Sequence, residues 1–220
     1  PAAEPEVAPA KAPEPPKATE PAVPPPASAA PKAAPPGAQA LWQRNRQPFD
    51  EADSRPRIAV VLTGLGLSSA TTEAAITQLP GAVTLSFTPY SRQLDQWVAL
   101  ARKNGHEVML DLPMEPTSYP DDDPGPQALL TALSPAQNLE RLAWTLGRAD
   151  GYVGVATVMG SRFTAAAESM QPILEAVKSQ GLIFLDNRSS DESVAGALAA
   201  KTGVASAIND RALDSPQASP

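Results

Sequence analysis

Two acidic side chains in one short segment are the first candidates for chemistry. Asp111 and Glu115 lie four residues apart in HEVMLDLPMEP (106–116). In an extended strand, alternation places Asp111 on the face opposite the leucines that flank it. Burying a carboxylate is costly unless it has a hydrogen-bond partner, a cation or an open cleft. Asp111 is therefore either a site residue or a structural carboxylate bound by loop amides, and both interpretations stay open.

A second candidate pair follows two other apolar segments. Asp186 ends LIFLD (182–186), and Arg162 follows YVGVATV (152–158) within MGSRFT. An arginine beside an aspartate keeps the carboxylate ionised and fixes its orientation. This pattern predicts catalytic residues at the mouth of a sheet, with a structural ion pair as the alternative.

The turn TGLGLSS (63–69) is typical of a loop between a strand and a helix. Its spacing is similar to that of a dinucleotide-binding loop, which makes a nucleotide-binding α/β domain a less favoured hypothesis. The third glycine of that pattern is replaced by Ser69, and no acidic residue ends the next apolar run. A tight turn that needs glycine for its backbone angles explains the same residues.

Two further residue types bear on ligands. His106 is the only histidine and there is no cysteine, so a zinc site built from histidine or thiolate ligands is excluded. We expect His106 to be structural. Tyr119 lies in the long segment after Asp111, and its ring is the predicted stacking face for a sugar.

These side chains must be positioned by elements that alternate along the chain. Apolar runs and amphipathic segments predict six strands and five helices, which is typical of an α/β protein with a parallel sheet. In such a sheet the chemistry lies at the carboxyl ends of the strands. The expected strands are 57–62, which we expect to be buried on both faces, 82–90, 106–112, 152–158, 182–186 and 204–208. The expected helices are 69–79, 92–105, 135–150, 164–179 and 190–201, with Ser69 as the cap of the first and Ser134-Pro135 as the start of the third.

Composition divides the chain into three parts. Residues 1–40 contain 13 of the 26 prolines together with 14 alanines and no aromatic residue, which predicts a disordered Pro/Ala linker. Residues 41–56 form a polar lead-in that Trp42 and Phe49 could fasten to the domain, and 57–220 form the domain itself. The net charge of −7 argues against a nucleic-acid partner.

Several strings carry a family resemblance. RIAVVLTGLGLS, LPGAVTLSFTPY, ARKNGHEVMLDLPMEP, DPGPQALLTALS, GYVGVATVMGSRFT and GLIFLDNRSS occur in this order. Together, over roughly residues 41–214, they resemble the divergent polysaccharide deacetylases of bacterial envelopes. The resemblance implies a distorted (β/α) barrel that lacks its last unit here, and a periplasmic location behind an N-terminal anchor that precedes Pro1.

The resemblance also implies a divalent metal that polarises the acetamide carbonyl and activates water. The metal ligands of the third strand fall on Asp111 and Glu115, whose oxygens suit a hard cation. In the family, an aspartate pair supplies the base and one metal ligand. This pair falls on Thr63 and Gly64, which can neither act as a base nor offer a carboxylate to a metal. Arg162 and Asp186 are retained as catalytic-type residues, whereas Thr157 and Val158 stand where other members carry Asn-His.

Two hypotheses about function follow. In the first, the protein belongs to carbohydrate metabolism as a deacetylase-family protein that acts on envelope polysaccharide with a degenerate or silent site. In the second, it is a non-catalytic envelope module that binds glycan or a protein partner. Loss of both carboxylates of the first strand removes the base and a ligand together, and each is worth on the order of 10²–10⁴ in rate. That loss favours a silent site.

Overall fold

The computed structural model describes residues 39–48, 50, 52 and 54–214. Most of the predicted Pro/Ala linker and Phe49 lie outside the described residues. The linker and the division into three parts therefore stay predictions.

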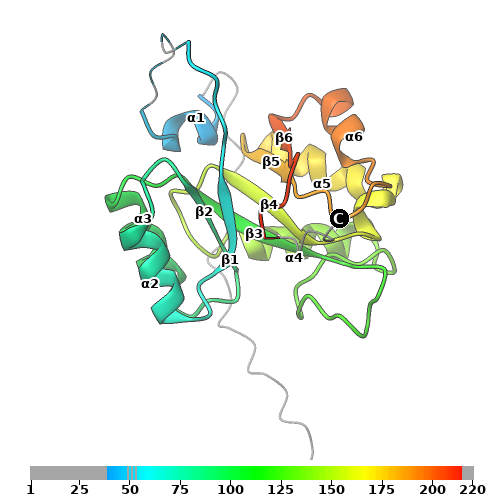
Figure 1. Cartoon of the computed structure of the whole chain (residues 1–220). Helices are drawn as coiled ribbons and strands as arrows, with labels where there is room; N and C mark the ends of the chain where they lie inside the picture. The colour runs from blue at the N-terminus through cyan, green and yellow to red at the C-terminus, as the bar shows by residue number, and fades with distance from the viewer. Residues whose placement is uncertain (1–38, 49, 51, 53, 215–220) are drawn as a thin grey trace, which may run out of the picture.

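One sheet of six parallel strands organises the domain, and its strand order follows the chain from β1 to β6 (Figure 1). The α/β alternation predicted from the sequence is confirmed. The described sheet is open, with β1 and β6 at its edges, so a barrel stays a prediction. The strands are β1 (Val61–Leu65), β2 (Thr84–Phe87), β3 (Val108–Met114), β4 (Gly154–Met159), β5 (Ile183–Asp186) and β6 (Ser206–Ile208).

The helices that connect the strands share one hydrophobic core with one face of the sheet. Figure 1 shows α2 and α3 beside β2, and α5 and α6 beside β5 and β6. No helix in the described part of the chain is both long and apolar enough to cross a membrane. The helices are α1 (Leu41–Asn45), α2 (Ser69–Gln78), α3 (Leu94–Lys103), α4 (Pro135–Leu146), α5 (Ala167–Ser179) and α6 (Ala195–Thr202), with a short 3-10 helix η1 (Phe163–Ala165).

The opposite face of the sheet carries a smaller apolar cluster. Met109, Val153, Ala156 and Leu185 are buried there, and Trp42 of α1 packs against them. The short helix α1 was not expected. It is fixed by a hydrogen bond of 2.9 Å from the Trp42 N–H to the Gly181 carbonyl, so Trp42 fastens the lead-in as predicted.

Local signals set several helix boundaries. Ser134 caps α4 in a reciprocal arrangement with Gln137, and Pro135 occupies the first turn. For α2 the expected cap was Ser69, but the residue that accepts the Thr71 N–H is Ser68. That expectation was wrong by one residue, because either serine could supply the oxygen.

The first strand differs most from its prediction. Residues 57–62 were expected to form a strand buried on both faces, yet β1 begins at Val61 and Ile58 is 90% exposed. Leu62 is also exposed. An edge strand has one strand neighbour, so its apolar side chains are buried only where another element covers them. Thr63 and Gly64 therefore lie inside β1, not in the turn after it.

Candidate functional site

Asp111 is the centre of a polar group on the face of the sheet opposite the helices. It lies in the middle of β3, beside Ala156 of β4, and is 2% exposed. The Ser86 hydroxyl of β2 donates to its Oδ1 at 2.6 Å. The Gly64 backbone N–H of β1 donates to its Oδ2 at 2.9 Å. The carboxylate therefore ties three strands together.

The bond from Gly64 to Asp111 also indicates the shape of the sheet. In a flat sheet β1 and β3 would be about 10 Å apart, since neighbouring strands are separated by about 4.8 Å. An aspartate side chain reaches a donor two strands away only if the sheet curves toward that face. The bulge between Leu62 and Leu65 in the β1–β2 pairing, together with Gly64 at φ +79°, adds to the local bend.

Burial changes the chemistry of Asp111. Desolvation raises the pKa of its carboxyl from 3.8 to about 6, against the opposing effect of the hydrogen bonds from Ser86 and Gly64. With a pKa of about 6, the protonated and the ionised forms of Asp111 are both populated under mildly acidic conditions.

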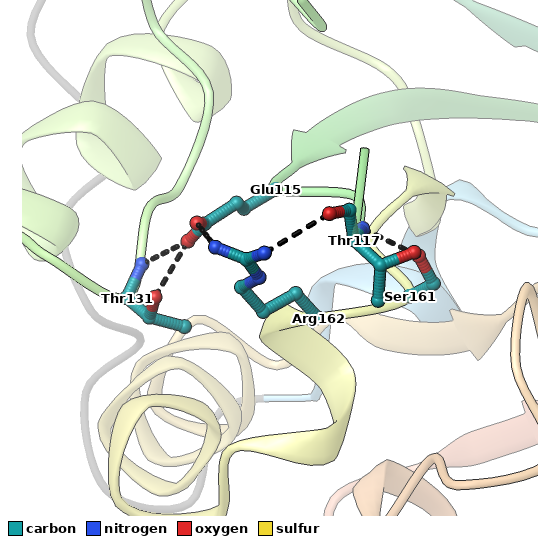
Figure 2. A network of polar contacts seen from close by, with 5 residues as sticks. All are labelled: Glu115, Thr117, Thr131, Ser161 and Arg162. Atoms are coloured by element: carbon teal, nitrogen blue, oxygen red, sulfur yellow. Dashed lines mark hydrogen bonds and ion pairs between the residues drawn. The ribbon is translucent and has the colours of Figure 1, made fainter. Parts of the chain in front are cut away.

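Glu115 lies just beyond the end of β3 in a separate polar network (Figure 2). Its Oε2 accepts bonds from the Thr131 N–H at 2.6 Å and the Thr131 hydroxyl at 2.7 Å. Its Oε1 pairs with Arg162 Nη1 at 3.2 Å. Arg162 Nη2 in turn donates to the Thr117 carbonyl at 2.9 Å. The buried carboxylate thus fastens the segment after β3 to the turn after β4.

Asp186 is also held by its own loop. Its Oδ1 accepts the Arg188 N–H at 2.9 Å and its Oδ2 accepts the Ser193 hydroxyl at 2.7 Å. The sequence suggested a pair between Arg162 and Asp186. That hypothesis was wrong, because Arg162 pairs with Glu115 and Asp186 is satisfied within residues 186–193.

The contacts of Asp111 and Glu115 bear on whether these two residues can bind a metal ion. Within residues 39–48, 50, 52 and 54–214, no group of three His, Asp or Glu side chains is arranged to hold one. Both oxygens of Asp111 face hydrogen-bond donors, and Glu115 binds Thr131 and Arg162. Each of these hydrogen bonds uses a lone pair that a cation would otherwise share, and the positive charge of Arg162 beside Glu115 repels a cation. The donor set therefore does not fit the metal that the family resemblance implies.

The other predicted residues have surroundings and contacts of their own. Thr63 is half-buried in β1. Tyr119 is half-buried in the loop after β3, where its N–H donates to the Pro116 carbonyl at 3.2 Å. Thr157 is buried in β4, and its hydroxyl accepts the Asn187 N–H at 2.9 Å.

Sequence reasoning missed the residues that complete these networks. Ser86, Thr131 and Ser193 each supply a hydroxyl to one of the three buried carboxylates. Serine and threonine are common in strands and loops, so nothing in their local sequence marks them. His106, which we expected to be structural, is buried, and its ring nitrogens lie 2.8 Å from the Val83 carbonyl and 3.0 Å from the Ile76 carbonyl.

Known proteins include related chains. The uncharacterized protein YibQ of Escherichia coli is 28% identical over 149 residues, which are 67% of this chain and 46% of that protein. An uncharacterized protein of Haemophilus influenzae is 28% identical over 156 residues, 70% of this chain and 54% of the relative. This chain thus spans about half the length of these curated relatives.

A solved structure and a family model agree with this relationship. The crystal structure of the uncharacterized protein ATU2773 from Agrobacterium tumefaciens C58 superposes with a TM-score of 0.81 at 33% identity, over 86% of this chain and 76% of that one. The model described as divergent polysaccharide deacetylase matches residues 60–220. With a matching family model over most of its length and a close structural relative, this chain belongs to the divergent polysaccharide deacetylase family.

Proposed function

We propose that this protein binds envelope polysaccharide in carbohydrate metabolism and that its deacetylase site is silent. Polysaccharide binding is supported by family membership. One observation carries the silent site: the Gly64 N–H donates to Asp111 Oδ2 at 2.9 Å. The family resemblance places a carboxylate ligand at position 64. Here the backbone supplies a hydrogen-bond donor instead, so the acidic residue of β3 is satisfied by the protein.

The second carboxylate supports the same conclusion. Glu115 forms an ion pair with Arg162 and accepts two bonds from Thr131. A carboxylate in these contacts holds loops together. Thr63, which falls on the position of the general base, has a hydroxyl that ordinary conditions do not deprotonate, so it cannot serve as that base.

Two finer proposals follow from the arrangement of the strands. We infer that the sheet is an arc of a (β/α) barrel, because its strands follow in chain order, its main helices pack on one face, and Asp111 reaches across β2 to β1. We also infer a periplasmic location, which is supported by the family resemblance to envelope proteins.

Metal titration tests the silent site. We expect no micromolar binding when the purified chain is titrated calorimetrically with Zn²⁺, Mn²⁺ or Ca²⁺. Binding that disappears in Asp111→Ala but persists in the exposed control Asp210→Ala would overturn the proposal.

Glycan binding tests the other half. A tetrasaccharide of N-acetylglucosamine is added with and without each metal ion, and both binding and release of acetate are measured. We expect binding without acetate release. Release of acetate that depends on Asp111 would show a working enzyme. If the chain binds neither this neutral tetrasaccharide nor an acidic one that alternates glucuronic acid with N-acetylglucosamine, the glycan-binding function is contradicted.

A further inference from the structure

Two residues with unusual backbone angles lie at the same edge of the sheet. Among the described residues other than glycine, only Met159 at φ 58° and Arg188 at φ 53° have a positive φ. Met159 ends β4, and Arg188 comes two residues after β5, the neighbouring strand. This is the carboxyl edge, where parallel α/β sheets bind their ligands.

The left-handed conformation of Arg188 is held from both sides. Its N–H donates to Asp186 Oδ1 at 2.9 Å. The preceding N–H, that of Asn187, donates to Thr157 Oγ1 at 2.9 Å. The following residue, Ser189, donates its hydroxyl to the Met159 carbonyl. A side chain other than glycine is strained in this region and stays there only where its surroundings fix it.

The fold alone does not explain an arginine at this position. Glycine would adopt the same φ without strain. The hydrogen bonds that hold the turn come from the Arg188 backbone and from its neighbours. The guanidinium contacts the same loop through an ion pair with Asp191, so a ligand carboxylate has to take the place of Asp191.

The guanidinium itself has an easily replaced partner. Arg188 is 51% exposed in its side chain and lies 3.5 Å from Asp191, whose side chain is 97% exposed. Such a solvated pair contributes little and exchanges readily for a better acceptor. Arg162 at the same edge differs, because it is bound to the buried carboxylate of Glu115 and to the Thr117 carbonyl.

Met159 adds an apolar surface beside this loop. Met159 is 40% exposed, and its carbonyl accepts a hydrogen bond from the Ser189 hydroxyl. A methionine side chain is flexible and adapts to irregular apolar surfaces, and the C–H groups of a sugar ring form such a surface. The carboxyl edge of the sheet thus carries the apolar side chain of Met159 and the guanidinium of Arg188 in two adjacent turns, which a hydrogen bond from Ser189 to Met159 joins.

We propose that Arg188 is the residue that recognises a carboxylate on the bound saccharide, with Met159 contacting the sugar ring. This assignment rests on the proposed glycan-binding function and deepens it, because it makes the preferred ligand an acidic polysaccharide. A planar guanidinium binds a carboxylate through two parallel hydrogen bonds, which an ammonium group cannot do.

The test compares two tetrasaccharides of equal length by calorimetry with the whole chain. One contains only N-acetylglucosamine, and the other alternates glucuronic acid with N-acetylglucosamine. The wild type should bind the acidic one at least tenfold more tightly, and this preference should weaken with added salt. Arg188→Gly and Arg188→Lys should lose the preference and bind the two tetrasaccharides with similar affinities.

Two controls separate recognition from folding. Arg188→Gly should melt at or above the wild-type temperature because glycine removes the strain. Lys103→Ala, which removes an exposed cation at the end of α3, should keep the acidic preference. Equal affinities of the wild type for the two ligands, or a preference that survives in Arg188→Gly, would overturn the role of Arg188 but leave the proposed glycan binding intact. Failure of the wild type to bind either ligand would overturn the proposed function together with it.

Discussion

The backbone N–H of Gly64 in β1 donates a hydrogen bond of 2.9 Å to the carboxylate of Asp111 in β3, across the intervening strand β2. Ser86 of β2 donates to the other oxygen. The one acidic residue in the middle of the sheet is therefore fully engaged by neighbouring strands. This relationship links the curvature of the sheet to the polar surroundings of Asp111.

Asp111 should make stability depend on pH. The pKa of its carboxyl is raised to about 6 in the folded chain, so the folded chain holds the proton more tightly than the unfolded chain. The resulting stabilisation is fully present below about pH 4 and is lost as the pH rises through about 6. Relative to Asp111→Asn, which cannot ionise, the wild type should lose up to about 3 kcal/mol between pH 4 and pH 7.5.

Urea midpoints of the two proteins at four pH values measure this difference. Asparagine keeps an acceptor for the Gly64 N–H, so the variant should fold. The exposed Asp210→Asn serves as the control and should follow the wild type throughout. Parallel pH profiles for wild type and Asp111→Asn would contradict the expected ionisation of a buried carboxyl.

A carboxylate at position 64 should be unfavourable next to Asp111. Gly64 has φ +79° and open space where a β-carbon would lie, and Gly151 matches it with φ +83° and equally open space. Gly64→Asp and Gly151→Asp therefore share a backbone cost of about 1–2 kcal/mol. Only the first adds like charge beside Asp111, so its stability should fall further by about 1–2 kcal/mol above pH 6.

Chemical denaturation of both variants at pH 5 and pH 8 checks this expectation. A gap between them that does not widen with pH would mean that the two carboxylates do not interact. Stabilisation of Gly64→Asp by Mn²⁺ would be a separate result, showing that one added carboxylate restores a cation site.

The ion pair between Glu115 and Arg162 should contribute to stability. Its distance is 3.2 Å, and the Arg162 side chain is half-exposed while that of Glu115 is buried. A double-mutant cycle with alanine at both positions should give a coupling of about 1 kcal/mol, because solvent screens the arginine. Glu115→Ala alone should cost about 2–3 kcal/mol, since the donors of Thr131 lose their acceptor.

The matched control is the exposed pair of Arg188 and Asp191 at 3.5 Å. Its cycle, measured by the same urea method, should give no detectable coupling. If both pairs couple equally, burial of Glu115 is not what strengthens the first one.

His106 should matter for stability and not for ligand binding. It is fully buried, and its ring nitrogens contact the carbonyls of Val83 and Ile76. His106→Leu would remove the ring N–H that these buried carbonyls can accept, at an expected cost of about 1–3 kcal/mol in unfolding free energy. Asn104→Ala, which removes an exposed side-chain bond to the Leu100 carbonyl, should change stability by less than about 0.5 kcal/mol. Equal effects of the two substitutions in a urea titration would contradict this.

The sequence by itself determined the class of fold and the main helix signals. Short apolar runs separated by amphipathic segments predict parallel strands with helical connections, because parallel neighbours must be joined by a long crossover, which is usually a helix. Ser134 and Pro135 marked the start of α4 because capping depends on residues within one turn. The acidic residues of β3 and β5 were likewise visible as exceptions within apolar runs.

Only the tertiary structure decided what those residues contact. The partners of Asp111 lie 25 and 47 residues away, at Ser86 and Gly64, and Arg162 binds Glu115 where the sequence suggested Asp186. The left-handed turn at Arg188 also depends on contacts from β4 and from the end of β5. Such contacts follow from the register and curvature of strands that are distant in the chain, and local residue patterns carry no record of either.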